Sequence, residues 1–145
     1  MAKPSVPKRQ DYSIFYQVET RWMDNDVYGH INNVVYYSYF DSITNRFLIE
    51  HEALDIHNGE QVGLMVHSQC FYHEPAAFPD ILQGGFRVKR IGNSSVEYEL
   101  ALFKQGKDEA CTHGTMTHVF VNKQTQTPVS IEGTLKAVLS SALCS

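Results

Sequence analysis

The stretch DNDVYGHINNVVYYSYFD, residues 24–41, has the most unusual composition in this chain. It places two carboxylates, a Gly-His pair and two consecutive Asn residues directly before a segment rich in aromatic and branched side chains. A turn needs far fewer special residues than this. The stretch is therefore either a plain loop that enters a buried helix or a reaction site built on the N-terminus of that helix.

A long helix is expected after this turn, over about residues 33–53. Tyr36, Phe40, Ile43 and Phe47 fall on one stripe at helical spacing, and the first three turns are apolar on nearly all sides. Such a helix cannot lie on a wet surface, so we expect a sheet to wrap around it.

Strand-like segments lie on both sides of this helix. Residues 13–22 alternate between apolar and mixed positions, which is the period of a half-buried strand. Four further segments of this kind follow the helix, each separated by turn residues: 63–73, 81–92, 94–106 and 111–123. A short final helix is expected within residues 128–143. This order predicts an α+β fold in which one long central helix packs on a curled antiparallel sheet of about five strands.

The length and composition limit the class of protein. The 145 residues suit one domain, 1–145, with residues 1–10 as a flexible arm rather than an export signal. No apolar run approaches the roughly 20 residues that a membrane span requires, so no membrane partner is expected. The net charge of −4 argues against a nucleic-acid partner.

The three cysteines are scattered and form no CxxC pair, which argues against a zinc site or a redox dithiol. A reducing cytoplasm is the simplest setting for three such cysteines, and we therefore expect a cytoplasmic protein.

Several spaced segments resemble the hot-dog-fold acyl-CoA thioesterases of the 4-hydroxybenzoyl-CoA thioesterase type. They are RWMDNDVYGHINNVVYYSYFD, FYHEPAAFPDIL, RIGNSSVEYEL and HVFVNKQTQTPV. The most specific part is D-x-D-x-x-G-H-x-N-N before a Tyr- and Phe-rich helix. The resemblance implies hydrolysis of an acyl-CoA or another acyl thioester without a cofactor, coenzyme A being part of the substrate. It also implies a homodimer or homotetramer with sites across the dimer contact.

Thioester hydrolysis needs a group that attacks or activates water, and donors that stabilise the oxyanion. A helix N-terminus supplies such donors through its free N–H groups and its positive dipole end. Asp24 and Asp26 are two residues apart, so only one is expected to point into the site. By position, the resemblance implies that Asp26 is the nucleophile or general base and that the backbone N–H of Asn33 is the oxyanion donor.

The other residues of the turn are expected to support the site rather than to react with the substrate. We expect Asp24 to brace the turn, Gly29 to permit a close backbone approach, and His30 to orient the carbonyl or the turn. The alternative for Asp26 is a turn or N-cap residue, and for Asn32 and Asn33 a plain helix cap. Asp41, on the helix, is the second candidate for the catalytic carboxylate.

Substrate contacts are harder to predict. Candidates for the lining of the acyl pocket are Val34, Tyr37, Phe40 and His67, and Asn32 is a further substrate-binding candidate. Arg87, Lys89 and Arg90 are candidates for the phosphates of coenzyme A, although solvated strand-edge charges are the more common case. The acyl group itself is not predicted.

Two other readings remain open. Asp24, Asp26 and His30 offer metal ligands within one loop, but no further ligand clusters near them, so no metal is predicted. A non-catalytic domain that binds acyl-CoA is the other alternative, because a fold does not define a function.

Overall fold

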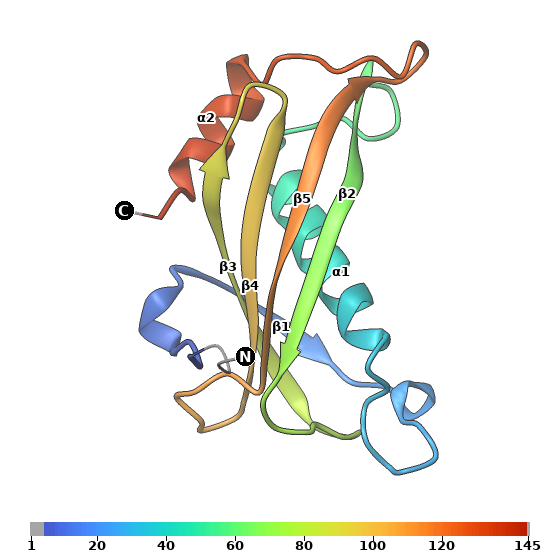
Figure 1. Cartoon of the computed structure of the whole chain (residues 1–145), viewed down its shortest axis with the longest axis vertical. Coiled ribbons are helices and arrows are strands. Elements are labelled where there is room, and N and C mark those ends of the chain that lie inside the picture. Colours follow the sequence, from blue (N-terminus) through green and yellow to red (C-terminus); the bar gives the residue numbers. More distant parts are fainter. Residues whose placement is uncertain (1–4, 145) are drawn as a thin grey trace.

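Five strands and two α-helices make up the computed structural model, which describes residues 5–144. The strands are β1 (Ile14–Glu19), β2 (Gln61–Tyr72), β3 (Ile81–Ile91), β4 (Ser95–Lys104) and β5 (Thr112–Asn122). The helices are α1 (Val35–Glu50) and α2 (Gly133–Ser141), and the short 3-10 turns are η1 (Arg9–Asp11) and η2 (Trp22–Asp24). Figure 1 shows the sheet curling past one side of α1. The predicted α+β plan, a hot-dog fold, is confirmed.

The sheet is antiparallel throughout, in the order β1-β3-β4-β5-β2. The strands on either side of α1 in the sequence, β1 and β2, therefore form the two edges. The central strand β4 alternates as predicted, and Val96, Tyr98, Leu100 and Leu102 are all buried.

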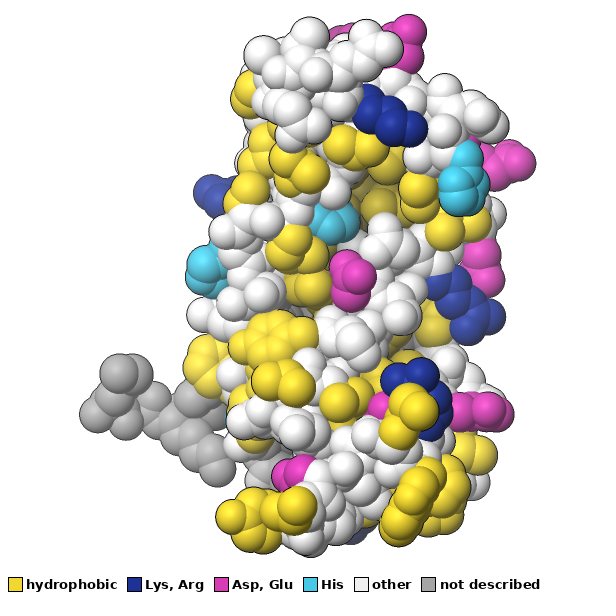
Figure 2. Space-filling model, turned by 90° about the vertical axis from the view of Figure 1, so that its right-hand side faces the viewer, with side chains coloured by type: hydrophobic (Ala, Val, Ile, Leu, Met, Phe, Trp, Pro, Cys, Tyr) yellow, Lys and Arg dark blue, Asp and Glu magenta, His cyan; other side chains and the backbone are white. Residues whose placement is uncertain are grey.

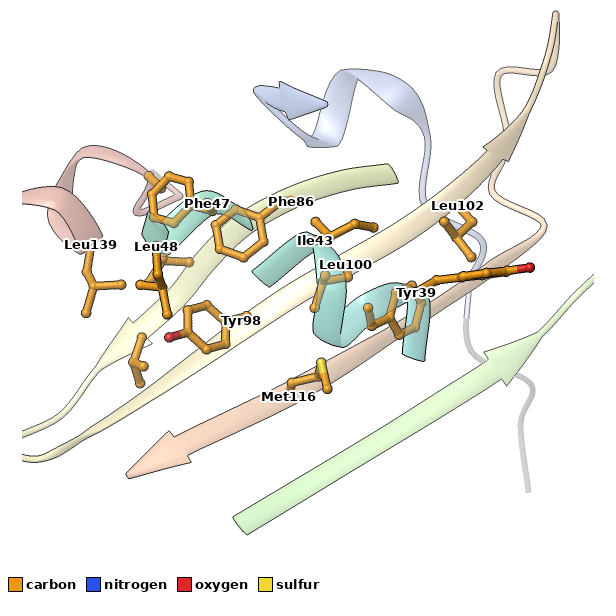
Figure 3. Close-up of a cluster of buried hydrophobic side chains, with 14 of the residues drawn as sticks. Tyr39, Ile43, Phe47, Leu48, Phe86, Tyr98, Leu100, Leu102, Met116 and Leu139 are labelled. Atoms are coloured by element: carbon orange, nitrogen blue, oxygen red, sulfur yellow. The ribbon is translucent and has the colours of Figure 1, made fainter. Parts of the chain in front are cut away.

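The core lies between this face of the sheet and α1. Figure 3 shows side chains of α1 meeting those of β3, β4, β5 and α2, and the labelled members are Tyr39, Ile43, Phe47, Leu48, Phe86, Tyr98, Leu100, Leu102, Met116 and Leu139. The predicted apolar stripe of the helix is confirmed, because Tyr36, Phe40, Ile43 and Phe47 are 3% exposed or less. Burial of this stripe against the sheet holds α1, and therefore its N-terminus, in place.

The helix is shorter than predicted at both ends. It begins at Val35 rather than at residue 33. The Asn32 side-chain oxygen accepts the N–H of Val34, and this local bond takes the place of helical hydrogen bonding there. It ends at Glu50, and Glu52 follows with a φ of 53°. The N–H of Ala53 then bonds the carbonyl of Leu48, which closes the helix in the manner of a Schellman turn.

Two other predicted boundaries differ. The first strand ends at Glu19 rather than at residue 22, and Trp22 lies in η2 and is 75% exposed. The predicted flexible arm lies partly outside the described residues, but residues 7–10 are docked on the turn between β4 and β5. The N–H of Arg9 bonds the carbonyl of Asp108, and the N–H of Ala110 bonds the carbonyl of Pro7.

Candidate active site

The turn at residues 24–33 connects η2 to α1 and is closed by its own backbone. The N–H of Asp26 bonds the carbonyl of His30, and the N–H of Gly29 bonds the carbonyl of Asp26. Gly29 has a φ of 80°, a conformation that a residue with a Cβ rarely adopts. The glycine therefore lets the chain reverse within this short loop, and the exposed His30 follows it.

Asp24 is a buried brace beneath this turn. One carboxylate oxygen accepts the N–H of Arg21 at 2.9 Å and the hydroxyl of Tyr39 at 2.6 Å, and the other accepts the Arg21 guanidinium at 3.0 Å. Burial by itself raises the pKa of the Asp24 carboxyl, but the hydrogen bonds from Tyr39 and Arg21 outweigh burial and lower it. Asp24 is thus held as an anion, and its hydrogen-bond donors are Arg21 and Tyr39.

Asp26 is half-buried and faces the other way. Its Oδ1 accepts the N–H groups of Tyr28 at 2.8 Å and of His30 at 3.4 Å, as in an Asx turn. Within residues 5–144, its Oδ2 has no hydrogen-bond partner. One oxygen therefore anchors the side chain, and the other remains available to a ligand.

The backbone around Asn33 is almost fully bonded. The N–H of Asn32 bonds the carbonyl of Asp24 at 2.8 Å, and the carbonyl of Asn32 accepts the N–H of Val35 at 2.9 Å. The Tyr72 hydroxyl donates to the carbonyl of Asn33 at 2.8 Å. In the described part of the chain, the N–H of Asn33 itself donates to no acceptor.

These groups meet at one surface pocket of about 360 Å³. Its wall contains four of the predicted site residues, Asp26, His30, Asn32 and Asn33. The residue with the available carboxylate oxygen and the residue with the unused backbone N–H thus line a common pocket at the N-terminus of α1. This pairing can supply a base or nucleophile together with an oxyanion donor.

The pocket also contains residues that we did not predict. They come from the end of β2 and the segment behind it, or from the first turn of α1: Tyr36, Tyr72, His73, Glu74 and Pro75. The segment FYHEP was part of the family resemblance, but no spacing within it indicated contact with residues 24–33. His73 lies against His113, with 2.7 Å between Nε2 and Nδ1 and the rings stacked.

The structure does not bring the predicted phosphate-binding residues to this pocket within one chain. Arg87 pairs with Glu99 at 2.9 Å, and Glu97 is shared by Lys89 at 3.4 Å and Arg90 at 3.8 Å. These ion pairs run between β3 and β4, and none of the three basic residues lines the pocket. A role for them toward coenzyme A stays a prediction.

The predicted acyl-pocket residues are also dispersed. Phe40 is fully buried in the core of the single chain, and its place in an acyl pocket stays a prediction. His67 pairs with Thr117 in the sheet, on the face of β5 that points away from α1. Val34 is exposed at the start of the helix, and Tyr37 lies beside Cys70 and Tyr72, where burial raises the pKa of its hydroxyl.

The three residues of the alternative metal set are divided by the fold. Asp24 is 1% exposed and committed to Arg21 and Tyr39, whereas Asp26 and His30 face the pocket. Within residues 5–144, no three His, Cys, Asp or Glu side chains are grouped as metal ligands.

The described helices are all too short or too polar to span a membrane.

Comparison with known proteins defines the class. The family model described as the Thioesterase superfamily matches residues 28–111, which contain Gly29, His30, Asn32 and Asn33. The chain belongs to the thioesterase superfamily. It is accordingly an enzyme of thioester hydrolysis with a hot-dog fold.

Three individual proteins show the range of similarity. The PA5185 protein of Pseudomonas aeruginosa strain PAO1 is 49% identical, with a TM-score of 0.94 over 97% of this chain and 99% of that chain. The structure of BH1999 gentisyl-coenzyme A thioesterase has a TM-score of 0.77 at 19% identity, over 87% of this chain and 99% of that one. YsmA of Bacillus subtilis (strain 168) is 24% identical over 122 residues, 84% of this chain and 82% of its own length.

Proposed function

We propose that this enzyme hydrolyses acyl-CoA thioesters to a carboxylic acid and free coenzyme A. The proposal is supported by the common pocket that Asp26 and Asn33 line, because within residues 5–144 the Oδ2 of Asp26 and the N–H of Asn33 have no hydrogen-bond partner. If the thioester carbonyl oxygen accepted this N–H, the carbonyl carbon would lie in the pocket that Asp26 also lines. Coenzyme A is favoured as the thiol because one structural neighbour is a gentisyl-coenzyme A thioesterase.

Asp26 acts in this scheme as the general base or the nucleophile. As a base it takes a proton from water while the water oxygen attacks the carbonyl carbon. As a nucleophile it forms an anhydride with the acyl group, which water then hydrolyses. In both cases the carbon–sulfur bond breaks, coenzyme A leaves as the thiolate and takes up a proton, and the N–H of Asn33 stabilises the oxyanion.

We also propose that the enzyme is a homodimer or a homotetramer built of dimers. The edge strand β2 carries exposed apolar side chains at Leu64, Met65 and Val66. Figure 2 shows hydrophobic side chains along the side of the molecule that bears β2 and α1. An unpaired edge with such side chains is a common place for a second sheet to join.

The test compares two carboxylates. Asp26→Asn preserves the shape of the side chain but removes its basicity, so turnover should fall by a factor on the order of 100 or more, with a smaller effect on KM. A panel of aliphatic and aromatic acyl-CoAs, assayed by release of the free thiol, provides the measurement. The exposed Asp41, the second candidate, is replaced in parallel as Asp41→Asn.

The two variants give separable outcomes. Loss of turnover in Asp26→Asn alone supports the proposal. Turnover that survives in Asp26→Asn but disappears in Asp41→Asn would move the catalytic role to α1. Binding of acyl-CoA without thiol release, across the whole panel, would support the non-catalytic alternative.

A further inference from the structure

The peptide groups on both sides of the Asn33 Cα are held by separate partners. On the N-terminal side, the carbonyl of Asn32 accepts the N–H of Val35 at 2.9 Å. On the C-terminal side, the carbonyl of Asn33 accepts the Tyr72 hydroxyl at 2.8 Å, and the N–H of Val34 donates to the Asn32 side chain at 3.2 Å. The N–H of Asn33 belongs to the first of these two peptides, and within the described residues it donates to no acceptor.

Tyr72 is the only one of these partners that comes from outside the turn and the helix. It is the last residue of β2, 39 positions from Asn33, and it lines the same pocket. Its ring meets the edge of Tyr36, on the first turn of α1, with 5.4 Å between the ring centroids. The sheet edge is therefore tied to the helix N-terminus through one phenol.

We propose that Tyr72 is a positioning residue: by holding the Asn33–Val34 peptide, it fixes the chain at the Asn33 Cα and so supports the preceding peptide, whose N–H is directed at the oxyanion. This inference rests on the proposed function, in which that N–H is the oxyanion donor. A donor stabilises the developing charge best when its direction is set before the reaction begins, because no free energy is then spent on reorientation. Without the phenol, the peptide that carries the Asn33 carbonyl could rotate toward solvent, and the Asn32–Asn33 peptide joined to it at the Asn33 Cα would lose this support.

Tyr72 is suited to a constant hydrogen bond and not to proton transfer. Burial raises the pKa of its hydroxyl, and the neighbouring Cys70 and Tyr37 raise it further. The hydroxyl consequently remains protonated, and a donor, throughout the range in which carboxylates and histidines titrate.

The first experiment removes only the hydroxyl. In Tyr72→Phe, which keeps the ring against Tyr36, kcat should fall about tenfold, and KM should change less than about twofold, because the lost contribution belongs to the transition state. The pH profile of kcat should keep its shape, since no titrating group is removed. The melting temperature reports whether the fold is intact.

A matched control is Tyr16→Phe. Tyr16 lies on β1, where its ring packs under the Arg46 guanidinium at 4.9 Å, and it does not line the pocket. This variant loses the same hydroxyl group and should retain the wild-type kcat and KM. An equal loss of kcat in both variants would overturn the proposal.

A second variant acts on the same peptide from its other end. Asn32→Ala removes the acceptor for the Val34 N–H, and it should also lower kcat. Because the two side chains hold one peptide, the losses in the double variant should be less than additive. If Tyr72→Phe does not fold, a wild-type kcat in Asn32→Ala would contradict the proposal that a fixed Asn33–Val34 peptide contributes to catalysis.

The outcomes separate this inference from the proposed function. A wild-type kcat in Tyr72→Phe, or an effect on KM alone, would overturn the positioning role even when Asp26→Asn is inactive. A wild-type kcat in Asp26→Asn would instead remove Asp26 from the proposed mechanism, whatever Tyr72→Phe does.

Discussion

The hydroxyl of Tyr39 donates a 2.6 Å hydrogen bond to Oδ2 of Asp24, and both side chains are buried. This bond joins the end of η2 to the second turn of α1. The same carboxylate accepts the N–H and the guanidinium of Arg21, so three donors converge on one buried anion. The loop that carries Asp26 is consequently anchored from beneath by a residue that does not face the pocket.

We expect Asp24→Asn to act on stability. An amide in place of the carboxylate loses the charge-assisted bonds from Tyr39 and Arg21, and the free energy of unfolding should fall by about 2 kcal/mol. Tyr39→Phe removes one of these bonds and should cost about 1 kcal/mol. Urea denaturation at neutral pH measures both changes. A normally stable Asp24→Asn variant without turnover would contradict a purely structural role for Asp24.

The stability of the fold should decrease on mild acidification. His118 is buried on β5 with its Nδ1 3.1 Å from the Tyr98 hydroxyl. Burial lowers the pKa of His118 below its ordinary value of 6.5, an effect that the charge of Asp41 reduces. For His113, burial and the neighbouring His73 lower the pKa in the same way. The unfolded chain therefore binds more protons than the folded chain once the pH falls through 6.5.

Denaturation curves on both sides of that pH measure the decrease. Replacing the buried imidazole, as in His118→Gln, should weaken the pH dependence, whereas the exposed His57→Gln should leave it unchanged. Identical pH dependence in wild type and His118→Gln would show that His118 does not contribute.

Chelation should leave turnover intact. Stabilisation of the oxyanion by the N–H of Asn33 requires no cation, and Asp24 is already committed to Arg21 and Tyr39. We expect purified enzyme to keep its thioesterase activity after exhaustive treatment with EDTA. Loss of activity that zinc or manganese restores would instead identify a metal hydrolase, in which the ion generates hydroxide and polarises the carbonyl.

Light scattering at micromolar concentration should detect a dimer or a tetramer. If β2 forms the contact, a charge at its exposed Val66, introduced as Val66→Lys, should shift the population toward monomer, because burying that charge is costly. Ile81→Lys, at the exposed start of β3, is a control of similar chemistry and should have no effect. A wild-type protein that is only monomeric would contradict the proposed assembly and weaken the case for a site completed by a partner.

Local sequence patterns were sufficient to predict the class of fold. The alternation of Val96, Tyr98, Leu100 and Leu102 and the helical stripe from Tyr36 to Phe47 are local patterns, and each imposes one buried face on its own segment. These faces have only a few ways to cover one another, so a long helix inside a curled sheet followed from periodicity. The Asp-Asn-Asp run at residues 24–26 also predicted the turn before the helix, because turn conformations depend on neighbouring residues.

Tertiary structure alone decided which distant groups meet this turn. The contact between Tyr72 and Asn33 depends on the register of β2 against β5 and on the curl of the sheet around α1. The same packing pairs Arg87, Lys89 and Arg90 with glutamates of β4 and buries Phe40. All four residues were predicted from the sequence as candidates for substrate contacts. Register and curl result from the packing of the whole core, and no short window of sequence contains the residues that set them.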